Sequence, residues 1–200
     1  MSNIRILHAS PDAPAVDVLA NDMLLAQNLT YRNFTDYLQV APGTYNIKVY
    51  PSGNRTNPII TTDITIPPQT IFTLALVGRL QDLAVQLIQD PKESIPPGQL
   101  KLRFAHLSPF TANVDVILGN FRLFTDVGYR EVTDYLAIDP GTFTLQLKLA
   151  SSDEVMLTVP NQTLTAGKFF TAYLVGLVGC TPGLQLLLPL DGNTYITPQD

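Results

Sequence analysis

A histidine, a serine and an aspartate recur at matching places in the two halves of this 200-residue sequence. In the first half they are His8, Ser10 and Asp36, and the second half repeats them as His106, Ser108 and Asp134. Histidine, serine and aspartate serve as base, nucleophile and orienting carboxylate in many hydrolases. A hydrolase acting on esters or sugars through these residues, with Asp17 as a further carboxylate, is therefore one hypothesis for the function.

The sequence around these residues favours a structural role over catalysis. No strand-to-helix elbow is predicted around Ser10, and no helix begins nearby to supply an oxyanion hole. His8 has the same strand parity as Ile6, and Asp36 the same parity as Leu38, so both are predicted to point to the core side of a strand end. Buried polar side chains are nearly always hydrogen-bonded. We therefore expect these side chains to form hydrogen bonds with backbone groups of the loop at Ser10-Pro11 and of its repeat at Ser108-Pro109, and we predict no catalytic residue.

Aspartates are also the first candidates for a metal site. Asp12, Asp17 and Asp22 have a spacing that suggests calcium, but they do not form an EF-hand loop, and the second half keeps only Asp115. The two histidines lie in different halves and do not suit one zinc ion. We predict no metal and no cofactor, and we expect Asp17 and Asp115 to face solvent or a neighbouring strand.

Tyrosines and arginines offer a groove for sugars or peptides. Tyr31 and Tyr37 flank Arg32, and the second half repeats this group as Tyr129, Arg130 and Tyr135. Such amphipathic side chains line ligand sites, although a tyrosine near a strand corner often only ties its hydroxyl to the backbone. We favour the structural interpretation here as well. The candidate binding residues are His8, Ser10, Asp17, Asp36, Tyr37, His106, Ser108, Asp115, Asp134 and Tyr135.

These recurrences are part of a duplication that holds at a constant offset of 98 residues from Ile4/Leu102 to Gly78/Gly176. Thr35-Asp36-Tyr37-Leu38 recurs as Thr133-Asp134-Tyr135-Leu136, and a three-residue insertion around Cys180 follows near the end. A segment rich in proline and charge, Asp90 to Gly98, separates the copies and is typical of a semi-rigid linker. We predict a first domain at 1–90, a linker at 91–99 and a second domain at 100–200.

Each copy has the alternation of β-strands. In Thr44-Tyr45-Asn46-Ile47-Lys48-Val49 every second residue is apolar, and turn residues such as Pro42-Gly43 and Ser52-Gly53 punctuate short β-rich runs. Seven or eight strands per copy are expected, without sustained helical periodicity. The predicted fold is all-β: two tandem immunoglobulin-like or transthyretin-like antiparallel β-sandwich domains.

Charge and hydropathy exclude some classes of protein. The net charge is −5 with only 12 lysines and arginines, which argues against a nucleic-acid partner. The uncharged run from Phe169 to Leu190 has the length of a membrane span, but its glycines and prolines favour a buried hairpin, so no transmembrane segment is predicted. The first residues show no secretory signal, and a cytoplasmic location stays open.

The first copy resembles a bacterial family known as domain of unknown function 4397. The likeness rests on His8-Ala9-Ser10-Pro11-Asp12-Ala13-Pro14-Ala15-Val16-Asp17-Val18 and recurs once per copy, although Phe110-Thr111-Ala112-Asn113 replaces Asp12-Ala13-Pro14-Ala15 in the second. The resemblance implies a small β-sandwich, often in exported or envelope-associated bacterial proteins, and no established activity.

These observations favour a non-catalytic binding or structural module, expected in the cell envelope or another surface layer. The predicted partner is a protein or a glycan. A hydrolase or a carbohydrate-binding protein that uses the His/Ser/Asp cluster is the alternative, and assembly into homo-oligomers through strand edges is a further hypothesis.

Overall fold

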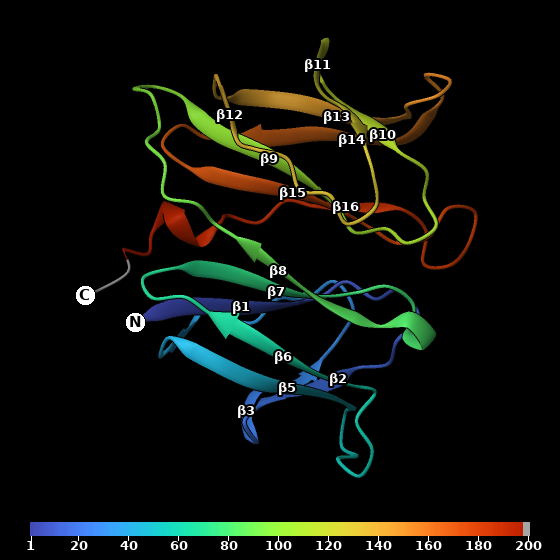
Figure 1. Ribbon diagram of the computed structural model, residues 1–200. Coiled ribbons are helices and arrows are strands. Elements are labelled where there is room, and N and C mark those ends of the chain that lie inside the picture. Colours follow the sequence, from blue (N-terminus) through green and yellow to red (C-terminus); the bar gives the residue numbers. More distant parts are fainter. Residues whose placement is uncertain (198–200) are drawn as a thin grey trace. The chain divides into compact units, whose positions relative to one another are not determined.

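The computed structural model describes residues 1–197 (Figure 1). Contacts divide the chain into two compact units. Unit one is Met1–Pro91 together with residues 195–197, and unit two is Lys92–Thr194. Each unit has its own pair of sheets and its own core, as a pair of duplicated domains requires.

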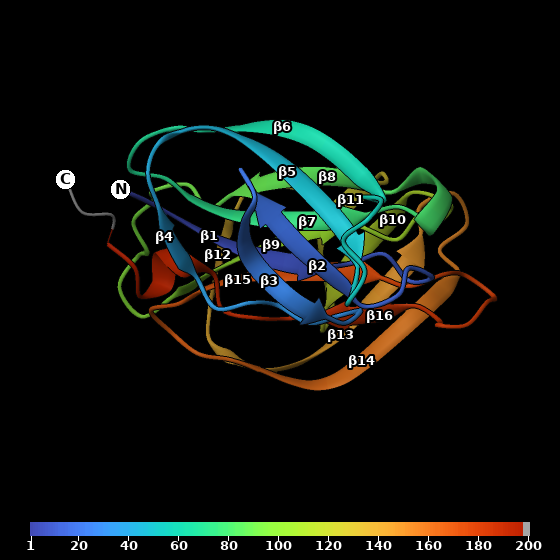
Figure 2. The ribbon, with the colours of Figure 1, turned by 90° about the horizontal axis from the view of Figure 1, so that it is seen from below.

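Unit one, the first sandwich, contains eight strands among the described residues. One sheet has the order β4-β1-β7-β8 and the other β3-β2-β5-β6, whose four strands lie side by side in Figure 2. The strands are β1 (Ser2–His8), β2 (Val16–Ala20), β3 (Met23–Leu29), β4 (Leu38–Val40), β5 (Gly43–Pro51), β6 (Ile60–Ile66), β7 (Ile71–Val77) and β8 (Ala84–Gln89). A short 3-10 turn at Leu80–Asp82 precedes β8.

Unit two, the second sandwich, repeats this arrangement strand for strand within the described part of the chain. Its sheets have the orders β12-β9-β15-β16 and β11-β10-β13-β14. The strands are β9 (Leu100–His106), β10 (Val114–Leu118), β11 (Phe121–Val127), β12 (Leu136–Ile138), β13 (Gly141–Leu149), β14 (Val155–Leu164), β15 (Phe169–Val175) and β16 (Gln185–Leu187). A 3-10 turn at Gly192–Thr194 follows.

The predicted fold class of two tandem β-sandwiches is confirmed. One detail differs from a purely antiparallel fold, because β1 pairs with β7 in parallel, as β9 does with β15. The uncharged run at 169–190 forms the expected hairpin, in which β15 pairs antiparallel with β16. Among residues 1–197, no helix is long and apolar enough to span a membrane.

The core lies between the two sheets of each sandwich and follows the alternation of the sequence. Ile47 and Val49 of β5 are fully buried, whereas Asn46 between Tyr45 and Ile47 binds the exposed Asp63 side chain on the outer face. In the second sandwich Leu145 and Leu147 take the equivalent core positions. Burial of these side chains removes apolar surface from water and stabilises each sandwich.

A β-bulge interrupts the same strand pair in both sandwiches. The register between β2 and β3 shifts around Val18, and Asn28 of β3 has a left-handed φ of 52°. The second sandwich repeats the shift between β10 and β11, where Asp126 has a φ of 55°. A bulge leaves a backbone N–H outside the strand ladder, and that group needs another acceptor.

Candidate functional site

The predicted burial of the two histidines is confirmed. His8 ends β1 and His106 ends β9, and both are fully buried. His8 Nε2 lies 2.9 Å from the Pro14 carbonyl oxygen, and His106 Nε2 lies 3.3 Å from that of Ala112. These bonds tie the histidine to the loop that follows the strand, which is the structural role that the sequence predicts.

Burial sets the charge of both histidines. It lowers the pKa of His8 below the usual 6.5, and the hydrogen bond to Pro14 only partly offsets this effect. Burial also lowers the pKa of His106, against a smaller opposite contribution from the bond to Ala112 and from the charge of Glu131. Both side chains are therefore neutral near pH 7.

The serines and aspartates do not complete a catalytic triad with these histidines. Ser10 is fully buried, and its hydroxyl has no hydrogen-bond partner among the described residues. Ser108 Oγ instead donates to the Gly176 carbonyl oxygen at 2.6 Å. The prediction that Asp36 and Asp134 point to the core side is wrong, because both are exposed.

The threonine that precedes each aspartate, rather than the aspartate itself, hydrogen-bonds the backbone of the neighbouring strand. Thr35 Oγ1 accepts a hydrogen bond from the Ile6 backbone N–H at 2.9 Å, and Thr133 Oγ1 accepts one from Phe104 at 3.0 Å. Each threonine hydroxyl also donates to the carbonyl oxygen of the aspartate that follows it. The prediction for Asp36 from strand parity is wrong because Asp36 lies before the first residue of β4, where side chains do not yet alternate between the two faces of a strand.

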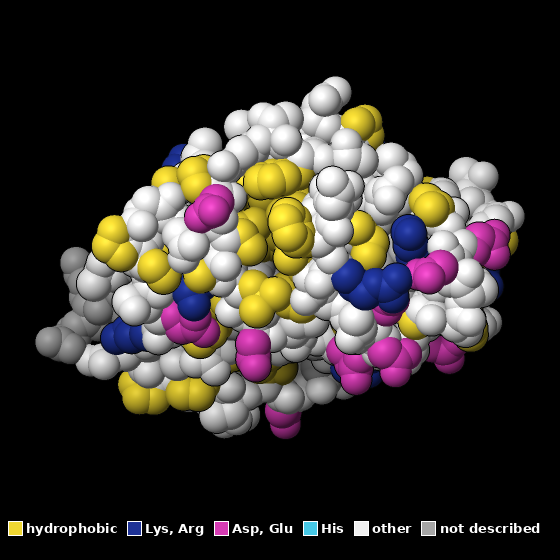
Figure 3. All heavy atoms as spheres, turned by 90° about the horizontal axis from the view of Figure 1, so that it is seen from above, with side chains coloured by type: hydrophobic (Ala, Val, Ile, Leu, Met, Phe, Trp, Pro, Cys, Tyr) yellow, Lys and Arg dark blue, Asp and Glu magenta, His cyan; other side chains and the backbone are white. Residues whose placement is uncertain are grey.

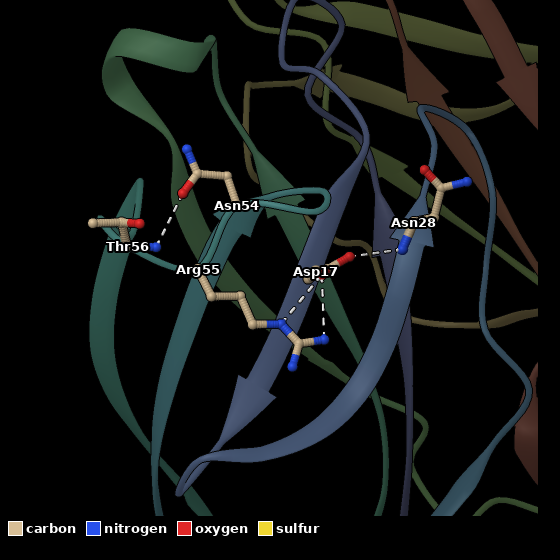
Figure 4. A network of polar contacts seen from close by, with 5 residues as sticks. All are labelled: Asp17, Asn28, Asn54, Arg55 and Thr56. Carbon is tan, nitrogen blue, oxygen red and sulfur yellow. Dashed lines mark hydrogen bonds and ion pairs between the residues drawn. The ribbon is translucent and has the colours of Figure 1, made fainter.

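Asp17 is buried on the outer face of β2 and holds the bulge of the neighbouring strand. Only 2% of its side chain is exposed, and its Oδ1 accepts the Asn28 backbone N–H at 2.9 Å. Arg55 reaches across from the loop after β5 and places Nε and Nη2 at 3.3 Å from Oδ2 (Figure 4). The sequence predicts that Asp17 faces either solvent or a neighbouring strand, and in the structure it faces the neighbouring strand β3.

Burial alone would raise the pKa of Asp17, but its hydrogen bonds outweigh that effect and lower the pKa. The donors are the backbone of Asn28, the side chain of Ser52, the backbone of Gly53 and the side chain of Arg55. The carboxylate is therefore charged at neutral pH and fully used by its own sandwich. A buried carboxylate in this state is a structural anchor rather than an acid or base.

Asp115 does the same in the second sandwich with a different partner. Its Oδ1 accepts the Asp126 backbone N–H at the bulge, at 2.8 Å. Its Oδ2 pairs with Nη1 of Arg122, whose Nη2 donates to Asp153 at 2.5 Å. Arg122 comes from β11 rather than from the loop after β13, which is the equivalent of the loop that carries Arg55, and 42% of its side chain is exposed.

Tyr37 belongs to a buried polar network that the sequence did not indicate. Its hydroxyl donates to Asp90 Oδ2 at 3.0 Å, rather than to the backbone as expected. The Arg5 guanidinium lies 4.9 Å from the Tyr37 ring centroid, and Arg5 Nε donates to Thr73 Oγ1 at 2.9 Å. Arg5 and Asp90 are both at least 96% buried, so Tyr37 serves the interior rather than a ligand groove.

The second sandwich contains the same network. Tyr135 donates to Asp191 Oδ2 at 2.6 Å, Arg103 Nε donates to Thr171 Oγ1 at 2.8 Å, and that hydroxyl donates to Asp191 at 2.5 Å. The sequence places Asp90 at the edge of the predicted linker. Its equivalence to Asp191 is visible only when the repeat is extended past the three-residue insertion near Cys180.

Tyr31 is likewise structural. Its ring packs edge-on against His8 with centroids 6.2 Å apart, and burial raises the pKa of Tyr31 to about 12. Tyr129 and His106 repeat the ring contact. The tyrosines of the predicted groove therefore pack around the buried histidines and the buried arginines.

A polar pocket of about 360 Å³ lies beside Asp115 on the second sandwich. Arg122 forms part of its wall, and the Nδ2 of Asn113 donates to Asp126 Oδ1 at 2.9 Å across another part. In the first sandwich the repeat places Ala15 and Leu24 at the positions of Asn113 and Arg122. The full lining is Ala112, Asn113, Asp115, Arg122, Thr125, Asp126, Leu149, Ala150 and Ser151.

Within residues 1–197, no three histidine, cysteine, aspartate or glutamate side chains come close enough together to hold a metal ion. Asp12 does not face Asp17, because its carboxylate binds Arg79 Nε and the Leu80 backbone N–H, each at 2.8 Å. Asp22 pairs with Lys48 at 2.7 Å. The three aspartates with calcium-like spacing thus have separate partners.

The duplicated strands and their shared polar networks define a protein of two tandem β-sandwiches. The sequence matches the family described as "Domain of unknown function (DUF4397)" over residues 2–117 and again over residues 106–199. The chain belongs to this family and contains two copies of its domain. No curated protein matches the chain.

Two solved structures are similar to the chain at low identity. One comes from a study of alpha-glucan binding by a streptococcal virulence factor, with 11% identity, coverage of 98% of this chain and 99% of that chain, and a TM-score of 0.32. The other is a family 26 carbohydrate-binding module of Eubacterium rectale Amy13K with maltoheptaose, with 9% identity, coverage of 96% and 99%, and a TM-score of 0.30. At these values neither structure bears on the ligand of this chain.

Proposed function

We propose that this chain is a non-catalytic binding module whose second sandwich holds a glycan in the pocket beside Arg122. The observation that supports the proposal is that the arginine of that pocket already forms ion pairs within the protein. Arg122 is already paired with Asp115 and Asp153, so an ionic ligand would have to compete with existing ion pairs. An uncharged ligand would leave those pairs intact.

The remaining hydrogen-bonding groups suit a ligand rich in hydroxyls. Two fifths of the Arg122 side chain is exposed, and its guanidinium has more N–H donors than its two carboxylate partners use. Thr125 and Ser151 add hydroxyls, and the Asp126 carboxylate adds acceptors. A sugar hydroxyl both donates and accepts, so it can engage donors and acceptors of this wall at the same time.

The surroundings also suit an uncharged ligand. Leu149, Ala112 and Ala150 give the pocket an apolar side, and its volume lies within the range of small-molecule sites. Figure 3 shows a face on which cationic and anionic side chains lie next to one another in several places, among hydrophobic and other atoms. Hydrolysis gains no support, because His8, Ser10 and Asp36 do not form a hydrogen-bonded chain.

A glycan array followed by calorimetry with the best-bound glycan tests the proposal. Asn113→Ala gives the pocket the residue of the first sandwich, and it is expected to weaken binding at least tenfold. Asn46→Ala, which removes a side-chain amide bonded to an aspartate in the first sandwich, is the matched control and should leave the affinity unchanged. Binding that survives Asn113→Ala, or an array without any bound glycan, would contradict the proposal.

The proposal includes a location in the bacterial cell envelope or another surface layer. Its support is the class of ligand, because glycans are exposed there. Fractionation of cells that produce the protein from its native gene tests the location. Recovery of the protein only with the cytoplasm would remove this part of the proposal.

A further inference from the structure

A second, apolar cavity of about 290 Å³ opens at the end of the first sandwich. It lies between the two sheets, and every strand from β1 to β6 contributes to its wall. Protein interiors are close-packed, and an unfilled apolar cavity forfeits dispersion contacts. The residues that form most of the wall are Ile4, Ala20, Met23, Val40, Ile47 and Ile64.

The wall is suited to hydrocarbon. None of the residues that line the cavity is charged. Of the polar side chains, Tyr45 already donates its hydroxyl to the Ala41 carbonyl oxygen at 2.7 Å, and Gln39 lies exposed on β4. Met23, with 67% of its surface exposed, is flexible enough to adapt to an incoming group. The inner part of a ligand would therefore contact only apolar side chains.

The dimensions of the cavity favour a linear ligand. The lining crosses all four strands of the β3-β2-β5-β6 sheet, and because neighbouring strands are ~4.8 Å apart, the two outer strands of the lining are about 14 Å apart. The wall therefore extends across the sheet from edge to edge, which favours an extended ligand over a compact one.

Most residues of this wall differ in the second sandwich, and two of the changes alter its volume and polarity directly. Ala20 becomes Leu118, whose larger side chain is buried in the second core, and Ile64 becomes the polar Gln162. The larger side chain takes up space between the sheets, and the amide is unfavourable beside hydrocarbon. The apolar cavity is therefore a property of the first sandwich and not of the repeated fold.

We propose that the first sandwich binds one uncharged, linear hydrocarbon chain between its two sheets. This site is separate from the polar pocket of the second sandwich, and it does not depend on the function proposed for that pocket.

Titration of octan-1-ol into the full chain tests the site, with the ¹³C-labelled methyl group of Met23 as the reporter. The unaltered protein is expected to bind one octanol per chain saturably and to shift the Met23 signal. Ala20→Leu, which introduces the residue of the second sandwich, is expected to weaken binding at least tenfold. Ala137→Leu adds the same side chain at an exposed position of the second sandwich and should bind like the unaltered protein.

Three results would overturn the inference: no saturable binding by the unaltered protein, equal affinity in Ala20→Leu, or equal affinity for the bulky adamantan-1-ol. If Ala20→Leu does not fold, Ile64→Gln serves in its place, with the same expected loss. Retained octanol affinity in a folded Ile64→Gln protein would then overturn the inference.

Discussion

Asp17 in the first sandwich and Asp115 in the second occupy the same place and make the same backbone contact, but their arginines come from different elements. Each carboxylate accepts the N–H of the bulge residue on the next strand, at 2.9 Å in the first sandwich and 2.8 Å in the second. Arg55 approaches from the loop after β5, whereas Arg122 lies on β11 itself. The hydrogen bond between the bulge N–H and the carboxylate is the same in both sandwiches. The arginine that pairs with the carboxylate comes from the loop after β5 in one sandwich and from β11 in the other.

The loops after β1 and β9 differ in the same way. Asp12 pins the first loop through Arg79 and the Leu80 backbone. Phe110 occupies the equivalent position of the second loop, with 76% of its surface exposed and a left-handed φ of 60°. Duplication thus preserved the strands and the buried polar networks, while loops and wall residues changed. Those changed residues are where the two pockets formed.

The largest expected effect comes from removing the bulge carboxylate. Asp17→Ala leaves the Asn28 N–H and the Arg55 guanidinium without their buried acceptor, which should cost about 2–4 kcal/mol in the free energy of unfolding. Urea unfolding of the full chain measures this loss, and hydrogen exchange localises it to the first sandwich. Asp63→Ala, at an exposed carboxylate, is the control and should change stability by less than about 0.5 kcal/mol. Similar values for the two variants would contradict a structural role for Asp17.

A pH dependence should follow from the two buried histidines, one in each sandwich. Burial lowers the pKa of folded His8 and His106 below 6.5, so the unfolded chain takes up protons first as the pH falls. The stability present at neutral pH is therefore lost progressively as the pH falls below 6.5. Melting temperatures at about pH 7.5 and about pH 5.5 test this window. In His8→Gln/His106→Gln the difference between the two values should shrink, and an unchanged difference would assign it to other groups.

The first loop should depend on its acid–base contact. Asp12→Ala removes one partly exposed ion pair and a bond to the Leu80 N–H, with an expected cost of about 1 kcal/mol. The melting temperature of the variant measures this cost, and added salt should reduce the difference from the unaltered protein. If salt does not change the difference in melting temperature, the ion pair between Asp12 and Arg79 does not contribute to the stability of the loop.

The second loop should gain stability from a glycine. Phe110→Gly relieves a left-handed conformation that large side chains disfavour, and because the ring is exposed little packing is lost. The expected gain is about 0.5–1 kcal/mol, read from the urea midpoint. A destabilised variant would show that the ring makes contacts that outweigh the backbone strain.

The repeat and the alternation of Tyr45, Ile47 and Val49 were sufficient to predict two sandwiches, because side-chain parity in a strand decides which face is buried. The burial of His8 followed from the same rule. The parity rule does not apply to Asp36, because Asp36 lies outside a strand. The role of Asp90 was not predicted, because an insertion shifts the position of its repeat partner, Asp191. The two pockets could not be predicted, since they depend on how side chains of several strands fill space.

The central claim is that the repeated polar residues hold the fold while residues that differ between the copies bind ligands. Parallel measurement of glycan affinity and melting temperature for His8→Gln and Asn113→Ala tests it most directly. We expect His8→Gln to melt at a lower temperature with its affinity intact, and Asn113→Ala to lose affinity with its melting temperature almost unchanged. The opposite pattern, lost binding in His8→Gln and full binding in Asn113→Ala, would contradict the account.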